Sequence, residues 1–172
     1  MKNPLPSLAS ILFLSRVACS LPPATFEIGA TAPDAAGGHL AYSRYLGESA
    51  FLQARLEEGV LRLDSRLSGI HHGLLALGLE EEASSHLFFR LSLGGGIGMI
   101  YNPGEKRSDR SDWLATTRIA PEVAWFPFGR FGVASVGLNL GINLQHRQSL
   151  TDHPLPRAIS REGAQIFAGV VL

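Results

Sequence analysis

One segment constrains the fold of this chain more than any other: from Phe131 to His146, FGVASVGLNLGINLQH, residue character alternates with a period of two. The even positions from Ala134 to Leu144 are apolar, whereas the odd positions from Ser135 to Gln145 are polar or glycine. Such alternation is typical of a β-strand with one apolar and one polar face. The segment is longer than most strands of soluble proteins, and it suits the roughly 9–11 tilted residues with which a strand crosses lipid.

Alternation of the same kind recurs along the chain, most clearly in 87–101, 113–125 and 164–172. We therefore predict eight strands. Their expected ranges are 25–32, 38–46, 50–63, 70–80, 86–101, 113–126, 131–146 and 163–172. Residues 49–67 are rich in helix formers, which leaves a helix there as an alternative. Gly59 and the lack of a persistent helical stripe favour the strand.

The connections between these strands alternate in length. The longer ones are 31–38, 64–69, 102–112 and 147–162, and the shorter ones are 46–49, 81–85 and 126–130. Bacterial outer-membrane barrels place short turns in the periplasm and longer loops outside. The pattern predicts an all-β fold: an eight-stranded antiparallel up-and-down transmembrane β-barrel. Its expected contact surfaces with partners are the polar loops Asn102–Asp112 and Arg147–Glu162.

Composition agrees with a membrane location. The chain has 172 residues, of which 45% are hydrophobic and only 17% charged, whereas a water-soluble surface is usually about a quarter to a third charged. No stretch approaches the roughly 18 apolar residues of a membrane helix, so a spanning chain would have to close into a barrel. The formal net charge is zero and no basic face stands out, so we predict no nucleic-acid partner.

The first twenty residues are predicted to be an export signal. Lys2 precedes an apolar core, Leu8–Leu14, and Ala18-Cys19-Ser20 offers small residues for cleavage. The domain organisation expected is a signal peptide at 1–20 and a single barrel at 21–172. Cys19, the only cysteine, is either removed with the signal or lipidated, and Arg16 three positions before it disfavours lipidation.

Two groups of residues are the predicted sites. The first is a structural polar network in the lumen, since eight strands leave room only for side chains and buried charges must pair. Its members are Glu27, Arg55, Glu57, Arg90, Arg118 and Glu122, with Glu80 a further candidate. The second group comprises aromatics at the lipid–water interface, with a heavy girdle at the short-turn end that also includes Phe51 and Phe88, and a thin girdle at the opposite rim that includes Tyr101 and Trp113. Its named members are Trp113, Trp125, Phe126, Phe128 and Phe131.

The motifs that suggest chemistry are weak, and we predict no enzyme, metal or cofactor. His71 and His72 are adjacent on a strand, so they point to opposite faces and cannot easily share one ion. His146 and Ser149 are three apart, which also places them on opposite faces if the strand continues. Gly94–Gly98 lacks the residues that complete a phosphate loop.

The strand at 131–146, the loop alternation and the C-terminal GAQIFAGVVL resemble the small outer-membrane barrels of Gram-negative bacteria. Such barrels usually end in an aromatic residue, from which Leu172 departs. Segments 69–102, 117–144 and 163–172 further resemble the conjugal-transfer TraO-like proteins of Bacteroidetes-type conjugative elements. The resemblance implies a component of an envelope DNA-transfer apparatus, with no catalytic residues to carry over.

These observations predict a non-enzymatic envelope component, exported to the outer membrane. Its expected partners are outer-membrane lipid, the barrel-assembly machinery and other envelope or transfer-apparatus proteins. Two alternatives remain: a lipid-modifying outer-membrane enzyme, and a secreted soluble β-sandwich or lipocalin-like binding protein.

Overall fold

The computed structural model describes residues 24–32, 36–63, 66–101, 112–129, 136–151 and 162–172. Its strands are β1 (Ala24–Ala32), β2 (Ala36–Tyr45), β3 (Ala50–Leu63), β4 (Arg66–Ser84), β5 (Leu87–Tyr101), β6 (Asp112–Trp125), β7 (Gly137–Ser149) and β8 (Glu162–Val171). Each strand pairs antiparallel with its neighbours in sequence, and β8 pairs with β1, so the sheet closes into an eight-stranded up-and-down barrel. The predicted all-β barrel is confirmed, and 49–67 forms strands rather than a helix.

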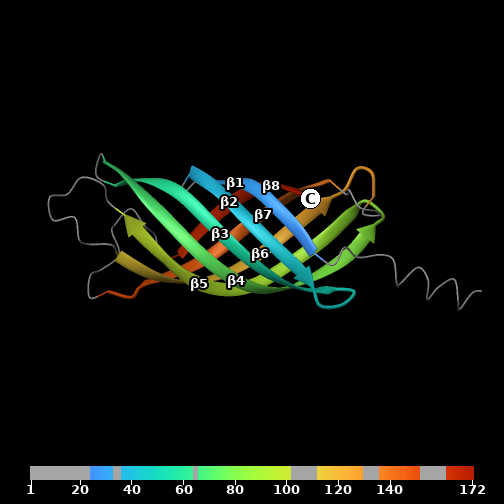
Figure 1. Cartoon of the computed structure of the whole chain (residues 1–172), viewed down its shortest axis with the longest axis horizontal. Helices are drawn as coiled ribbons and strands as arrows, with labels where there is room; N and C mark the ends of the chain where they lie inside the picture. The colour runs from blue at the N-terminus through green and yellow to red at the C-terminus, as the bar shows by residue number, and fades with distance from the viewer. Residues whose placement is uncertain (1–23, 33–35, 64–65, 102–111, 130–135, 152–161) are drawn as a thin grey trace, which may run out of the picture.

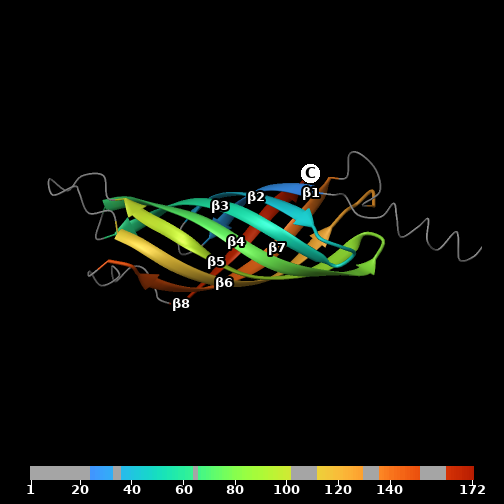
Figure 2. The ribbon, with the colours of Figure 1, turned by 60° about the horizontal axis from the view of Figure 1, so that its bottom comes forward.

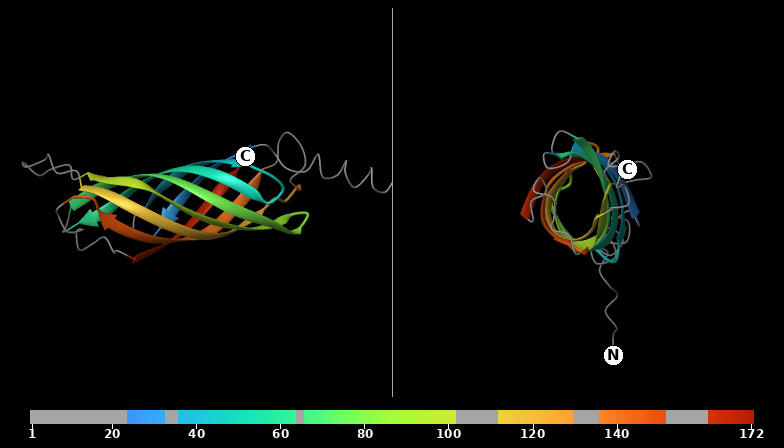
Figure 3. Two further views of the ribbon diagram at one scale, coloured as in Figure 1. Left: turned by 90° about the horizontal axis from the view of Figure 1, so that it is seen from below. Right: turned by 90° about the vertical axis from the view of Figure 1, so that its left-hand side faces the viewer.

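The barrel is long and narrow, with strands tilted strongly to its axis (Figures 1 and 2). Seen along the axis, its wall is oval in section (Figure 3). The closing seam runs from Glu27 opposite Val171 to Ala32 opposite Ile166. Reciprocal backbone hydrogen bonds between Phe26 and Leu172, at 2.7 and 3.0 Å, extend the seam to the last residue.

Two ends can be distinguished by their connections. The turn end is where β2, β4 and β6 end and β3, β5 and β7 begin, together with the beginning of β1 and the end of β8. The loop end is where β1, β3, β5 and β7 end and β2, β4, β6 and β8 begin. The turn end lies on the right and the loop end on the left in Figure 1.

The predicted alternation of loop lengths is only partly correct. Strands β1 to β4 pair further than expected, which reduces the first and third connections to 33–35 and 64–65. The seventh strand begins at Gly137 rather than at residue 131 and runs to Ser149, past the expected end at 146. Its shift lengthens the third short connection and places Arg147, predicted in a loop, within β7. Residues 130–135 lie outside the described residues.

Burial follows the period of two along most of the described strand positions, with interruptions at Gly94–Gly96 in β5 and at the end of β4. In β7, for example, Asn139 and Asn143 are fully buried, while Leu140 and Ile142 are exposed. The positions buried inside the barrel are largely polar at mid-height, and the exposed positions are largely apolar. This arrangement reverses that of most soluble proteins.

Candidate functional site

The lumen holds the densest group of chemically capable side chains in the described part of the chain. All six predicted lumen residues are buried there, as are Glu80 and Arg147. Among the described residues, the buried charged side chains are thus four glutamates and four arginines, which balance one another. The even positions of β5 and β6 and the odd positions of β3 face inward, and this shared parity brings the charges together.

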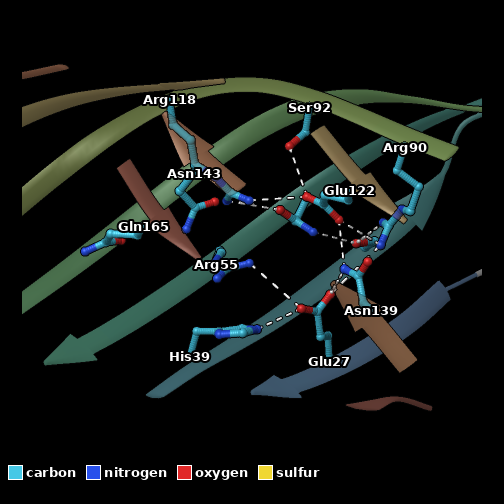
Figure 4. Close-up of polar contacts among 12 residues, drawn as sticks. Glu27, His39, Arg55, Arg90, Ser92, Arg118, Glu122, Asn139, Asn143 and Gln165 are labelled. Atoms are coloured by element: carbon cyan, nitrogen blue, oxygen red, sulfur yellow. Dashed lines mark hydrogen bonds and ion pairs between the residues drawn. The ribbon is translucent and has the colours of Figure 1, made fainter. Parts of the chain in front are cut away.

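Glu122 lies near the centre of the network (Figure 4). Its carboxylate accepts hydrogen bonds from Arg118 Nη2 at 3.3 Å, Asn139 Nδ2 at 2.8 Å and Ser92 Oγ at 3.4 Å. Arg90 Nη1 lies 3.3 Å from Glu122 Oε2, the same oxygen that accepts from Asn139. Two guanidinium groups therefore lie beside this one carboxylate, and the three side chains form a single connected group of charges.

A second carboxylate, Glu27, ties β1 into the same network. Glu27 Oε1 lies 2.7 Å from His39 Nε2, and its Oε2 accepts a hydrogen bond from Asn139 Nδ2 at 2.8 Å. Arg55 and Arg90 each approach Glu27 to 3.9 Å. One amide nitrogen of Asn139 therefore bridges Glu27 and Glu122, linking strands from opposite ends of the sequence (Figure 4).

The remaining charges form pairs on either side of this centre. Arg55 Nε donates to Glu57 at 2.7 Å toward the loop end. Arg90 Nε lies 3.4 Å from Glu80, which also accepts a hydrogen bond from Tyr45 at 2.8 Å. Pairing of this kind is what makes burial of several charges tolerable, because an isolated ion in such surroundings would be very unfavourable.

Aromatic rings occupy the space between the guanidinium groups. The Arg90 guanidinium lies 4.4 Å from the centre of the Phe51 ring, and that of Arg55 lies 4.4 Å from the centre of Phe167. A cation over a ring face is attracted by the ring quadrupole. The Phe167 ring in turn lies against Gly141, where a side-chain carbon would collide with it. Rings and guanidinium groups thus pack against one another in the middle of the barrel.

Apolar residues cover this network toward the turn end. Phe88, Ala124, Phe126 and Val171 form a buried cluster, in which the two phenylalanine rings meet edge to face at 5.6 Å. The backbone N–H of Phe126 donates to the His86 carbonyl at 2.8 Å, and His86 Nδ1 lies 3.0 Å from the Phe126 carbonyl oxygen. These two contacts hold Phe126 in place.

This cluster corrects part of the predicted aromatic girdle. Phe126, predicted at the lipid–water interface, is only 2% exposed, because its even position continues the inward parity of β6. Phe51 and Phe88 are buried for the same reason.

The other predicted interface aromatics lie on the outer surface where they are described. Trp113 and Trp125, at opposite ends of β6, are each nearly half exposed. Phe128, in the connection that follows β6, is 90% exposed. Phe131 and the predicted signal at 1–20, including Cys19, lie outside the described residues.

Sequence reasoning missed several members of the network. His39, Gln53, Asn139, Asn143 and Arg147 are all buried in the lumen, but none was assigned to the site. Their inward parity was the signal that could have identified them. The contacts themselves could not be predicted, since Asn139 lies 112 residues from Glu27 in the sequence.

The residue pairs that suggested other chemistry have their two side chains on opposite faces of the barrel wall. His71 is exposed on the outside whereas His72 is buried, as strand geometry predicts. His146 is exposed and pairs with Glu162 at 2.7 Å, while the hydroxyl of Ser149 bonds to Thr151. Among the described residues, no group of three or more histidine, cysteine or acidic side chains is placed to hold a metal ion. The same residues include no helix long and apolar enough to cross a bilayer.

Comparison with protein-family models, with characterised proteins and with solved structures finds no match to this chain.

Proposed function

We propose that this protein is a non-enzymatic outer-membrane β-barrel, spanning the membrane with β1–β8 and serving as a structural or contact component of the envelope. The observation that carries the proposal is the contrast between its two surfaces. The inner surface is a neutralised polar network, and the outer surface is a continuous apolar belt. An apolar exterior is favourable in the hydrocarbon of a bilayer, whereas in water its exposure is unfavourable.

The limits of the belt are marked by polar side chains that point outward. Arg44 and Glu81 lie near the turn end. Near the loop end lie Glu58, His71, His146, Gln148 and Glu162. Between these limits, the outward positions of the described strands are apolar, aromatic or glycine, with the exception of Thr117. Exposed apolar patches on soluble monomers rarely exceed a few hundred Å².

The height of the barrel also suits a membrane. Trp113 and Trp125 are twelve positions apart on β6. At about 3.3 Å per residue and a tilt of about 40°, they are separated by about 30 Å along the axis. This is close to the thickness of the hydrocarbon core, and tryptophan favours both of its boundaries.

A filled lumen favours anchoring and contact over transport. Salt-bridged side chains occupy mid-height, and the cluster around Phe126 covers them at the turn end. The loop end, which carries the connections 102–111 and 150–161, is the proposed contact surface. Membership of a conjugative transfer apparatus remains a prediction from sequence resemblance.

The soluble binding protein is a weaker alternative. A lipocalin-like binder needs a cavity in the barrel and a polar exterior, whereas the described interior is filled by charged and aromatic side chains. The lipid-modifying enzyme also stays a prediction. Unchanged lipid A mass spectra after overexpression would count against it.

Fractionation of cells that express the full chain tests the proposal. We expect the protein in the outer-membrane fraction, with a band that migrates differently in detergent gels before and after heating. Purified protein in planar bilayers should give no stable conductance. Full solubility without detergent would contradict the membrane location, and a steady ion current would contradict the closed lumen.

A further inference from the structure

The outer wall is hollowed over β1 to β4. A groove of about 320 Å³ lies there, and its lining is almost entirely apolar. Its sides are formed by the exposed side chains of Phe26, Leu40, Tyr42, Leu56 and Leu75. The small residues Ala54 and Gly73 line the space between them. A hollow of this size is at the small end of the range that holds a ligand.

A cation lies beside the groove on its turn-end side. Arg44 is exposed on the outer face of β2, two positions from Tyr42 toward the turn end. Ala24 and Leu52 lie opposite it on β1 and β3, so no charge adjoins it on the wall. In the described part of the chain its side chain makes no hydrogen bond or ion pair. It is also the only outward-facing arginine or lysine among the side chains that the structure describes.

Arg44 lies at the height of the lipid–water boundary. Its row of cross-strand partners reaches Ile119 in β6, and Trp125 lies six positions from Ile119 toward the turn end. The register of the seam makes each such row climb toward the loop end from β1 to β8. At about 4.8 Å between strands, about 3.3 Å per residue and a tilt of about 40°, the row climbs about 12 Å and the descent to Trp125 is about 15 Å. Arg44 is therefore within about 3 Å of Trp125 along the axis, and its long side chain can reach further toward the headgroups.

The groove extends from this level into the apolar belt. The outward row next to Arg44 holds Tyr42 and Ala54, and the row after it holds Leu56 and Gly73. On the proposed function, Arg44 is level with the phospholipid headgroups of the leaflet at the turn end, and the groove is level with their acyl chains. The charged contact with a bound lipid then falls at the boundary, and the hydrocarbon holds only apolar contacts.

We propose that this site binds an anionic phospholipid of the phosphatidylglycerol type, an inference that rests on the proposed function. The Arg44 guanidinium pairs with the lipid phosphate, to which it can donate two parallel hydrogen bonds. One acyl chain lies along the groove over Ala54 and Gly73. A zwitterionic headgroup fits less well, because its ammonium group competes for the phosphate and finds no carboxylate beside Arg44 on the wall, where the neighbours are Ala24 and Leu52.

The barrel contains matched controls for both parts of the site. Glu81 is also an outward-facing charge near the turn end, but it lies on β4 and does not line the groove. Ala168 is an outward-facing alanine like Ala54, but it lies on β8, outside the groove. A general effect of losing an exposed charge or of adding bulk should appear at the control positions as well, whereas lipid binding should depend on Arg44 and Ala54.

Native mass spectrometry of the full chain in detergent tests the proposal. The probes are phosphatidylglycerol and phosphatidylethanolamine with identical acyl chains. We expect the wild type to retain phosphatidylglycerol about fivefold better, the preference that one exposed ion pair can supply. Arg44→Gln should remove most of that preference, and Glu81→Gln should leave it intact. Ala54→Phe, which fills the groove, should weaken retention of both lipids, whereas Ala168→Phe should not.

A competition experiment separates a lipid from a free anion. Inorganic phosphate at the same concentration should not displace phosphatidylglycerol from the wild type, because it has no chain to occupy the groove. Displacement would overturn the proposal, since it would mean that Arg44 binds phosphate without the groove.

Equal retention of the two lipids by the wild type, or the same preference in Arg44→Gln as in wild type, would also overturn it. So would an equal loss in either control variant. Each sample is first checked for the heat-dependent gel shift. A shifted band without lipid preference refutes the lipid site but leaves the proposed membrane barrel standing, whereas full solubility without detergent refutes both.

Discussion

In this protein, the inner and outer faces of a single strand differ more than the turn end and the loop end of the barrel do. Along β7, Leu138, Leu140 and Ile142 point outward and are about half exposed, while Asn139 and Asn143 point inward and are fully buried. The two faces therefore depend on different interactions. The inner face is stabilised by pairing of polar groups, and the outer face, in the proposed membrane, by removal of apolar surface from water.

Loss of a central charge on the inner face should have the largest effect. Glu122→Gln leaves Arg90 and Arg118 without their nearest shared carboxylate, at a place where all three side chains are almost fully buried. We expect the free energy of unfolding to fall by about 3–5 kcal/mol. Urea titration in lipid vesicles, followed by tryptophan fluorescence, measures the change.

Glu81→Gln is the control for that substitution, because Glu81 is exposed on the outer face of β4. Its effect should stay within about 0.5 kcal/mol. Equal effects of the two substitutions would mean that the lumen is open to water, contrary to the packing seen around Glu122.

A charge introduced on the outer face should have the next largest effect. Leu140→Arg places a cation near the middle of the apolar belt, which costs about 2–4 kcal/mol at the centre of a bilayer. We expect reduced assembly, measured as the fraction of chains that show the heat-dependent gel shift in membranes.

Gln148→Arg makes a similar change on the same face of the same strand, but beyond the limit of the belt. Near the interface the cost falls to about 0–1 kcal/mol, so assembly should be close to that of wild type. If both arginines were tolerated equally, the outer surface would not face lipid.

Adding a methyl group should also have different effects on the stability of the inner and outer faces. At Gly141 a methyl group meets the Phe167 ring, so Gly141→Ala should cost about 1–3 kcal/mol in the free energy of unfolding. At Gly73, on the outer face, the same methyl group makes only an ordinary contact with Leu56. The same urea titration should find Gly73→Ala close to wild type, and a similar loss in both variants would argue against tight packing of the lumen.

The smallest effect is expected from an ion pair on the outer face. Glu58→Gln disrupts the exposed pair with His71 and should change the free energy of unfolding by less than about 1 kcal/mol. A loss as large as that of Glu122→Gln would show that the exposed pair is not solvated. Urea titration of the two variants side by side makes the comparison.

The alternation follows from the sequence alone, and it sets the number of strands and the face on which most residues lie. Inward parity assigned Glu27, Arg55 and Arg118 to the lumen before any fold was known, because successive side chains in a strand must point to opposite faces. Parity also separated His71 from His72.

Strand ends and partners were decided by the tertiary structure. Alternation does not specify where pairing stops, so β7 starts at Gly137 and 33–35 replaces a longer predicted loop. Proximity to a turn suggested an interface position for Phe126, whereas the closed wall places its ring inside. The bridge from Glu27 through Asn139 to Glu122 exists only because β8 returns to β1 and encloses a lumen. Period and polarity are local properties of the chain, but pairing across the lumen depends on closure and register, which many distant residues fix together.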